Sequence, residues 1–113
     1  MLLRVGALPE GALDAATAFH AEVLTQIRDS LAGTADDLVL LFAPASHEHH
    51  GWRLAAVQQL AREHAPRRAN ALESDDEAAI AAALDYCARA PGLTGQLLRL
   101  DGNGAGALLS SGI

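Results

Sequence analysis

The sequence predicts an α/β fold in which four short strands alternate with three helices. Short apolar runs alternate with helical patterns, one of these runs is apolar throughout, and half of the 113 residues are apolar although only 4% are aromatic. Strands joined by helices pair in parallel through right-handed connections. We therefore expect the order β-α-β-α-β-α-β, with a four-stranded mainly parallel sheet in a minimal Rossmann-like three-layer sandwich. At this length residues 1–113 form a single domain.

The first half of the chain predicts a strand, a helix and a second strand. Residues 2–8 form a short apolar run that ends at Pro9. Apolar side chains then recur every fourth residue from about 14 to 31, which indicates one face of a helix. Residues 38–43 are apolar throughout, which is typical of a strand buried on both faces of a parallel sheet. The helical stripe consists of Phe19, Val23, Ile27 and Leu31.

The middle of the chain continues the alternation. A helix is expected over about residues 52–64, and residues 67–72 indicate a short strand. Ser74 and Glu77 have the spacing of a capping box, which predicts that the third helix begins there. This helix presents an apolar face that includes Cys87, so we expect that thiol to be buried.

The last elements are a strand over residues 95–100 and a turn over residues 101–104. Residues 105–113 form a tail of small and apolar residues, which we interpret as flexible or as a segment that docks on a partner.

Composition and charge exclude several classes of function. The formal net charge is −6, with 14 acidic against 8 basic residues. This balance argues against nucleic-acid binding, which depends on clustered Lys and Arg. No apolar run approaches the roughly 20 residues of a membrane span, and no signal peptide is apparent. The lone Cys87 cannot form a disulfide within the chain, so we expect a cytoplasmic protein. From the charge and the short apolar runs we expect neither nucleic-acid nor membrane partners.

A polar loop after the apolar strand is the candidate ligand site, because ligands in open α/β sheets bind at the carboxyl ends of strands. His47 and His49 are weak candidates for metal ligands, since imidazole suits Zn²⁺ or Ni²⁺. A serine next to histidines also permits a nucleophile and base. A loop that only caps the next helix explains the same residues, and we favour it. The ligand-loop candidates are Ser46, His47, His49, His50 and Arg53.

Three passages resemble the short-chain dehydrogenase/reductase family. Residues 93–102, with the letters TGQ and DG, resemble the closing strand of that family. Residues 60–71 are similar to its helix-to-strand passage that contains the letters AP and NA. Residues 38–46 resemble its strand that ends in the catalytic serine. The resemblance covers most of this chain but only the C-terminal part of a family member.

The resemblance implies a dinucleotide cofactor and a catalytic Tyr-x-x-x-Lys pair, and neither motif is present. The turn at residues 6–11 lacks the glycine spacing of the cofactor motif. One alignment puts Ser46 and His50 at the Tyr and Lys positions, and another puts His50 and Leu54 there. The only tyrosine, Tyr86, lies in the last helix, and we find no lysine. We therefore expect no cofactor and no catalytic residues.

The family also pairs its subunits through two long helices, which correspond here to residues 14–31 and 52–64. Our leading hypothesis is a truncated, non-catalytic domain that forms a homodimer or a heteromer with a full-length dehydrogenase-like protein. One alternative is a small-ligand or metal-binding module that uses residues 46–53. Another is a residual oxidoreductase or hydrolase completed by a partner chain. The helical stripe can equally face the chain's own sheet. The interface candidates are Phe19, Val23, Ile27, Leu31, Trp52 and Leu60.

Overall fold

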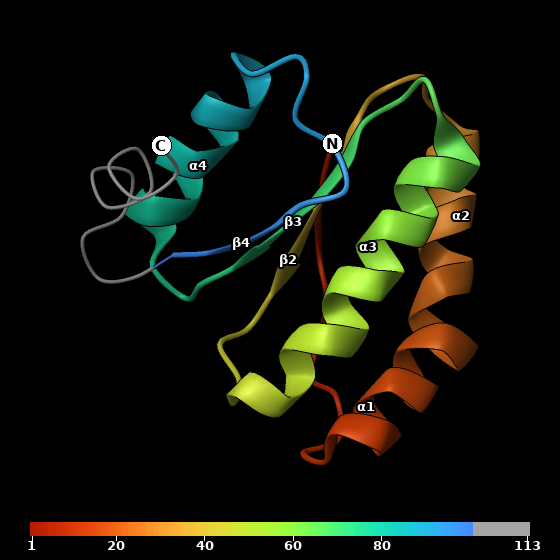
Figure 1. Cartoon of the computed structure of the whole chain (residues 1–113). Coiled ribbons are helices and arrows are strands. Elements are labelled where there is room, and N and C mark those ends of the chain that lie inside the picture. The colour runs from red at the N-terminus through yellow and green to blue at the C-terminus, as the bar shows by residue number, and fades with distance from the viewer. Residues whose placement is uncertain (101–113) are drawn as a thin grey trace.

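A computed structural model describes residues 1–100 and arranges the strands and helices in three layers (Figure 1). The predicted alternation of strands and helices is confirmed. The predicted turn at 101–104 and the tail at 105–113 lie outside the described residues. The strands are β1 (Leu2–Arg4), β2 (Leu38–Phe42), β3 (Ala69–Glu73) and β4 (Leu97–Arg99). The helices are α1 (Ala12–Ala18), α2 (Leu24–Ala32), α3 (His50–His64) and α4 (Glu77–Ala88).

The sheet has the strand order β1-β2-β3-β4, and every neighbouring pair is parallel. β2 is a central strand whose residues are buried except for the half-buried Val39. The uninterrupted apolar run is explained by helices that cover both faces of the sheet. The prediction of a parallel, three-layer α/β fold is therefore confirmed.

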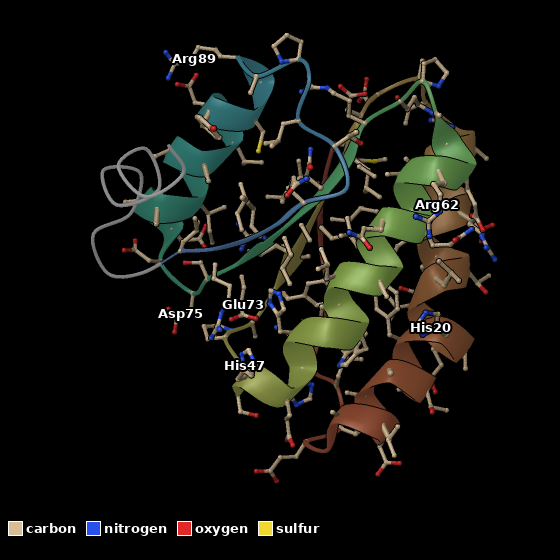
Figure 2. The ribbon with its side chains drawn as sticks, in the orientation of Figure 1. His20, His47, Arg62, Glu73, Asp75 and Arg89 are labelled. Atoms are coloured by element: carbon tan, nitrogen blue, oxygen red, sulfur yellow. The ribbon has the colours of Figure 1, made fainter. Side chains whose placement is uncertain are left out.

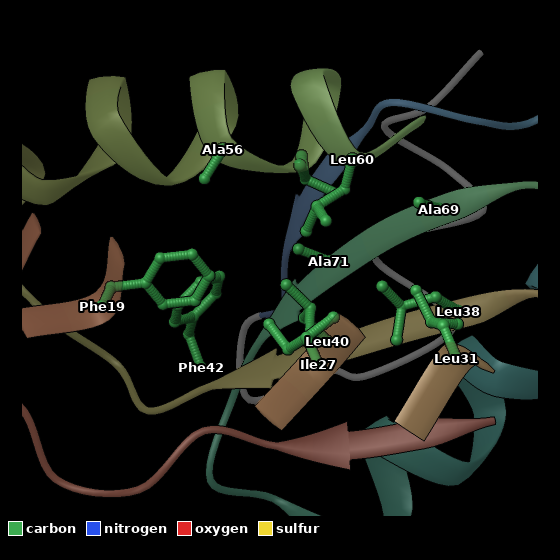
Figure 3. Packing of buried hydrophobic residues seen from close by; sticks show 11 residues of the cluster. Phe19, Ile27, Leu31, Leu38, Leu40, Phe42, Ala56, Leu60, Ala69 and Ala71 are labelled. Carbon is green, nitrogen blue, oxygen red and sulfur yellow. The ribbon is translucent and has the colours of Figure 1, made fainter. Parts of the chain in front are cut away.

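The two faces of the sheet carry cores of different size. Within residues 1–100, the helices α1, α2 and α3 cover one face, and α4 is the helix on the other (Figure 1). Figure 3 shows the larger core, in which Phe19, Ile27 and Leu31 pack against alternate residues of β2 and β3. The smaller core consists of Leu41, Leu72, Ile80 and Ala83.

The connection through α4 corrects the prediction that all crossovers are right-handed. The strands continue in one direction across the sheet from β1 to β4, while α4 lies on the face opposite α3. The first two connections follow the right-handed rule, and the third therefore has the opposite hand. The physical reason is coverage: with all the helices on one face, the apolar Leu41 and Leu72 would be left in water.

The apolar stripe of the first helical segment faces the sheet. Phe19, Ile27 and Leu31, and Leu60 of α3, are at most 2% exposed. The structure thus corrects their choice as interface residues, because the chain's own sheet already covers them. Val23 and Trp52 are half-buried and pack against the same core.

The first helical segment is one continuous run with a change of winding. A π-helical turn at Phe19–Val23 joins α1 to α2. Such turns occur as single insertions within α-helices. Phe19, the first residue of this turn, is fully buried against Phe42 and Trp52, with ring centroids 5.7 and 5.4 Å away.

The predicted capping box is wrong. Asp76 is the N-cap of α4, and its carboxylate accepts hydrogen bonds from the backbone N–H groups of Ala78 and Ala79. Ser74 instead accepts from the Asp76 N–H and closes a turn before the helix. Glu77 is drawn away from the cap by Arg4 of β1, whose guanidinium binds both carboxylate oxygens.

The remaining element predictions hold with small shifts. The Cys87 thiol is buried as expected, and this burial raises its pKa.

None of the helices in residues 1–100 combines the length and apolar character that a membrane crossing requires.

Candidate functional site

A cleft of about 660 Å³ opens at the carboxyl ends of β1 and β2. One wall is the loop after β1, residues 5–10, and the other is the last residue of β2 with the loop that follows it, residues 42–46. Parallel strands end at the same edge of the sheet, and their diverging loops leave a crevice there. Three predicted loop residues, Ser46, His49 and Arg53, line this cleft.

Arg53 is the buried charge of the cleft. Its side chain comes from α3 and is only 6% exposed. Its Nη1 donates to the carbonyl oxygen of Ala43 at 2.9 Å and to Oε1 of Glu73 at 2.7 Å. The guanidinium carbon lies 4.5 Å from the ring centroid of Phe42. Burial lowers the pKa of Arg53, but a guanidinium remains charged at any physiological pH.

The partner of Arg53 is a carboxylate that serves two arginines. Glu73 ends β3 and is 6% exposed. Its Oε2 accepts a hydrogen bond of 2.9 Å from Nε of Arg99, which ends β4. Arg53, Glu73 and Arg99, which we call the Arg–Glu–Arg triad, therefore carry one surplus positive charge. Figure 2 shows Glu73 at the same end of the molecule as His47.

The buried His49 is fully occupied by hydrogen bonds. Its Nε2 lies 2.9 Å from the carbonyl oxygen of Glu10, and its Nδ1 lies 3.1 Å from Nε1 of Trp52. A carbonyl only accepts and an indole N–H only donates, so Nε2 carries the proton and Nδ1 accepts. His49 thus ties the loop after β1 to the start of α3 and has no nitrogen free for a metal.

The other two histidines pair with each other. The rings of His47 and His50 stack with centroids 5.9 Å apart. Nδ1 of His50 is buried and has no hydrogen-bond partner within residues 1–100. In that part of the chain no three His, Cys, Asp or Glu side chains gather as a metal site would require. The predicted pairing of His47 with His49 around a metal finds no support in this geometry.

Ser46 lies in the cleft wall without the capping role that we favoured. It is the N-cap of a short 3₁₀ turn, His47–His49, that leads into α3, but its side chain makes no capping hydrogen bond. Its carbonyl oxygen accepts from the His49 N–H instead.

Sequence reasoning missed two parts of the site. The loop after β1 was treated only as a failed cofactor turn, although it forms a wall of the cleft. Glu73 was overlooked because the predicted strand ended one residue before it. An acidic residue at the end of an apolar strand is the signal that could have found it, since such a carboxylate needs a cationic partner when buried.

A comparison with known families matches residues 3–100 to the family described as "SDR-like: Short chain dehydrogenase-like protein". The chain belongs to this family. The resemblance that three separate passages indicated is thereby confirmed across nearly the whole described SDR-like fold. Searches of curated proteins and of solved structures found no significant match.

The SDR-like cleft holds different side chains from those that the Tyr-x-x-x-Lys chemistry needs. Tyr86 lies on α4, across the sheet from the cleft. Ser46 is the hydroxyl residue in the cleft wall, and Arg53 is its buried cation.

Proposed function

We propose that this SDR-like chain binds a small molecule in the cleft and does not transfer a hydride to it. The observation that carries the proposal is the cleft itself, which combines a volume suited to a metabolite with a buried guanidinium in its wall. The geometry thus favours the small-ligand function, which the sequence offered as an alternative to assembly. The ligand loop is residues 46–53, joined by the loop after β1.

The composition supports the non-catalytic part of the proposal. In the resembled family a lysine lowers the pKa of the tyrosine that transfers the proton. All eight basic residues of this chain are arginines, and its single tyrosine is Tyr86. An arginine does not replace a lysine that must tune a neighbouring acid, because its charge is spread over a planar guanidinium and its hydrogen-bond geometry differs.

The test is a titration of the isotope-labelled protein followed by two-dimensional NMR. A panel of small acids, alcohols, amides and the reduced nicotinamide cofactors is added one at a time. The proposal expects shifts of Ala7, Ala45 and Ser46 with at least one small molecule. Hydride turnover by the purified chain, or turnover in a mixture with a dehydrogenase-like partner that exceeds the partner's own rate, would contradict the non-catalytic proposal and favour the residual enzyme.

A second candidate function is association with a second copy or with a full-length relative. The observation that favours it is β1, an edge strand of the sheet in residues 1–100. The carbonyl oxygen of Met1 and the N–H of Val5 form hydrogen bonds with β2. The N–H and carbonyl groups of Leu2 and Arg4 therefore point away from β2. A groove of about 340 Å³ beside this edge is lined by the half-buried Leu2, Val39 and Leu84.

For this second candidate we propose an interface at the β1 edge in place of the two helices. The exposed side chains of α2 and α3 are polar or small, and Leu13 is the large apolar side chain that residues 1–100 expose, at 86%. Light scattering after size exclusion at micromolar concentration tests association. A strict monomer that also fails to bind a dehydrogenase-like protein contradicts it.

A further inference from the structure

We propose that the ligand of the cleft is a small monocarboxylic acid with an apolar body, and that Arg53 binds its carboxylate. This inference rests on the proposal that the cleft binds a ligand, and it names the chemical class. It is carried by three observations: the surplus charge of the triad, the apolar walls of the cleft and the acidic residues at its rim.

The surplus charge points to an anionic ligand. Glu73 is shared by two arginines, so within residues 1–100 the triad holds one more positive than negative charge. An anion bound next to Arg53 would balance this charge and add a charge-assisted hydrogen bond. Arg99 is 47% exposed and is solvated by water, whereas Arg53 is buried and lines the cleft, so Arg53 is the cation that a ligand in the cleft would meet.

One edge of the Arg53 guanidinium is left for a ligand. Both of its hydrogen bonds to the chain use Nη1. Nε is buried and has no acceptor in the described part of the chain. Nη2 makes no hydrogen bond to residues 1–100, and because Arg53 lines the cleft we assign Nη2 as the nitrogen that binds the ligand. The ring of Phe42 beneath the guanidinium holds it in place before any ligand arrives.

The walls of the cleft call for an apolar ligand body. They present hydrocarbon from both loops, with Val5, Leu8 and Pro9 on one side and Phe42 and Pro44 on the other. Burying an aliphatic chain or an aromatic ring against these side chains is favourable in proportion to the apolar area removed from water.

The rim of the cleft excludes a second negative charge. Glu10 and Glu48 line the cleft and are exposed, so their carboxylates repel any anion at the mouth. A dicarboxylic acid or a phosphate monoester of similar size would meet this repulsion. A monocarboxylate that points inward avoids it, which gives the site a charge selectivity.

The test compares matched ligands on the unmodified protein by NMR titration and calorimetry. Benzoate is compared with benzamide, hexanoate with adipate, and benzoate with phenyl phosphate. We expect the monocarboxylate of each pair to bind at least about tenfold more tightly, because a charge-assisted hydrogen bond to a buried guanidinium is lost or opposed in its partner. The shifts should centre on Ala43, Ala45 and the loop after β1.

Three variants assign the effect to Arg53. Arg53→Gln should abolish the preference for benzoate over benzamide, and its fold is protected because Glu73 keeps Arg99 as a partner. Arg89→Gln makes the same change of charge on the exposed residue that follows α4 and should leave binding unchanged. Glu48→Gln should raise the affinity for adipate more than that for hexanoate.

The outcomes separate the two proposals. If no member of the panel shifts the cleft residues, the proposed ligand-binding function fails. If benzamide binds as tightly as benzoate, or phenyl phosphate more tightly, the cleft is a ligand site but the monocarboxylate inference is overturned. Should Arg53→Gln not fold, the ligand pairs on the unmodified protein decide the question by themselves.

Discussion

At the scale of single residues, the molecule is organised by where each buried polar group finds its partner. Arg53 reaches Glu73, and His49 reaches both Glu10 and Trp52. The contacts of Arg53 with Glu73 and of His49 with Glu10 join segments far apart in the sequence, whereas the contact of His49 with Trp52 is local. Buried polar groups without partners are costly, so these pairs determine the shape of the cleft as well as its charge.

Replacing Glu73 tests how much the Arg–Glu–Arg triad contributes to the stability of the fold. Glu73→Gln leaves Arg53 buried without a carboxylate, and we expect the free energy of unfolding to fall by about 3 kcal/mol. Urea denaturation followed by circular dichroism measures it. Glu77→Gln breaks the exposed pair with Arg4 and serves as the control with little expected change. An equal effect of both variants would contradict the importance that we give to burial.

Asp37 provides a prediction of pH dependence. Hydrogen bonds from the backbone N–H and the guanidinium of Arg68 hold the pKa of Asp37 below its ordinary value, the backbone bond being the larger cause. Its contribution to stability is therefore complete above the ordinary pKa of an aspartate and is lost as the pH falls through the lowered, folded-state pKa. In acid titrations monitored by fluorescence of Trp52, Asp37→Asn should lose less stability between neutral and acidic pH than the unmodified chain. An unchanged acid profile would contradict this role.

At the scale of elements, helix starts decide how α3 and α4 are placed. α3 follows a 3₁₀ turn whose N-cap residue, Ser46, makes no side-chain bond, and it is held instead by His49 and Arg53. α4 has a conventional side-chain cap at Asp76. The two helices on opposite faces of the sheet are thus anchored by different means.

The cap of α4 yields a direct mutational test. Asp76→Ala removes the acceptor for two backbone N–H groups, and we expect a loss of about 1 kcal/mol in the free energy of unfolding. Asp75→Ala removes the same charge from the preceding residue and is the matched control. Thermal denaturation of both variants measures the difference. A larger loss for Asp75→Ala would show that charge near the helix end matters more than the cap.

At the scale of the whole molecule, the sheet is covered unequally. In the described residues 1–100, one face carries α1, α2 and α3, the other carries only α4, and β1 is an edge strand. The reversed crossover through α4 gives the second face its cover, and Leu2 and Val39 remain half-buried beside it. Unpaired edges next to apolar surface are places where chains associate.

The open edge can be tested with a proline. Leu2→Pro removes an outward N–H without disturbing the bonds of β1 to β2, so the fold should persist while any association through this edge is lost. Light scattering of this variant and of the unmodified chain at equal concentration measures the effect. Leu13→Ser, on the far side of the molecule from α4, is the control and should not change the mass. Association that survives Leu2→Pro contradicts the assignment of the edge.

Much of the fold could be predicted from local patterns. The apolar residues at every fourth position from Phe19 to Leu31 predict a helix, and the apolar run of β2 predicts a central strand. Both patterns depend only on neighbours in the chain. The hand of the last crossover and the cap at Asp76 could not be predicted in this way. The hand of the crossover depends on which face of the sheet the other helices leave uncovered. The cap depends on the contact between Arg4 and Glu77, which holds Glu77 away from the start of the helix.

The same distinction holds for the candidate site. The position of the loop with Ser46, His49 and Arg53 at a strand end could be predicted, but its chemistry could not. Of the histidines predicted as metal ligands, His49 binds a carbonyl and an indole, and His47 stacks on His50. Glu73 comes from the end of β3, and no spacing pattern in the sequence predicts its contact with Arg53.

By itself the sequence determined the family, the alternation of strands and helices, and the lack of lysine, because these are properties of residue identity and order. The tertiary structure alone decided which face each helix covers, which histidine nitrogens are occupied and that two arginines share one buried carboxylate. Those outcomes depend on distances between segments separated by dozens of residues, which are settled only when the chain packs.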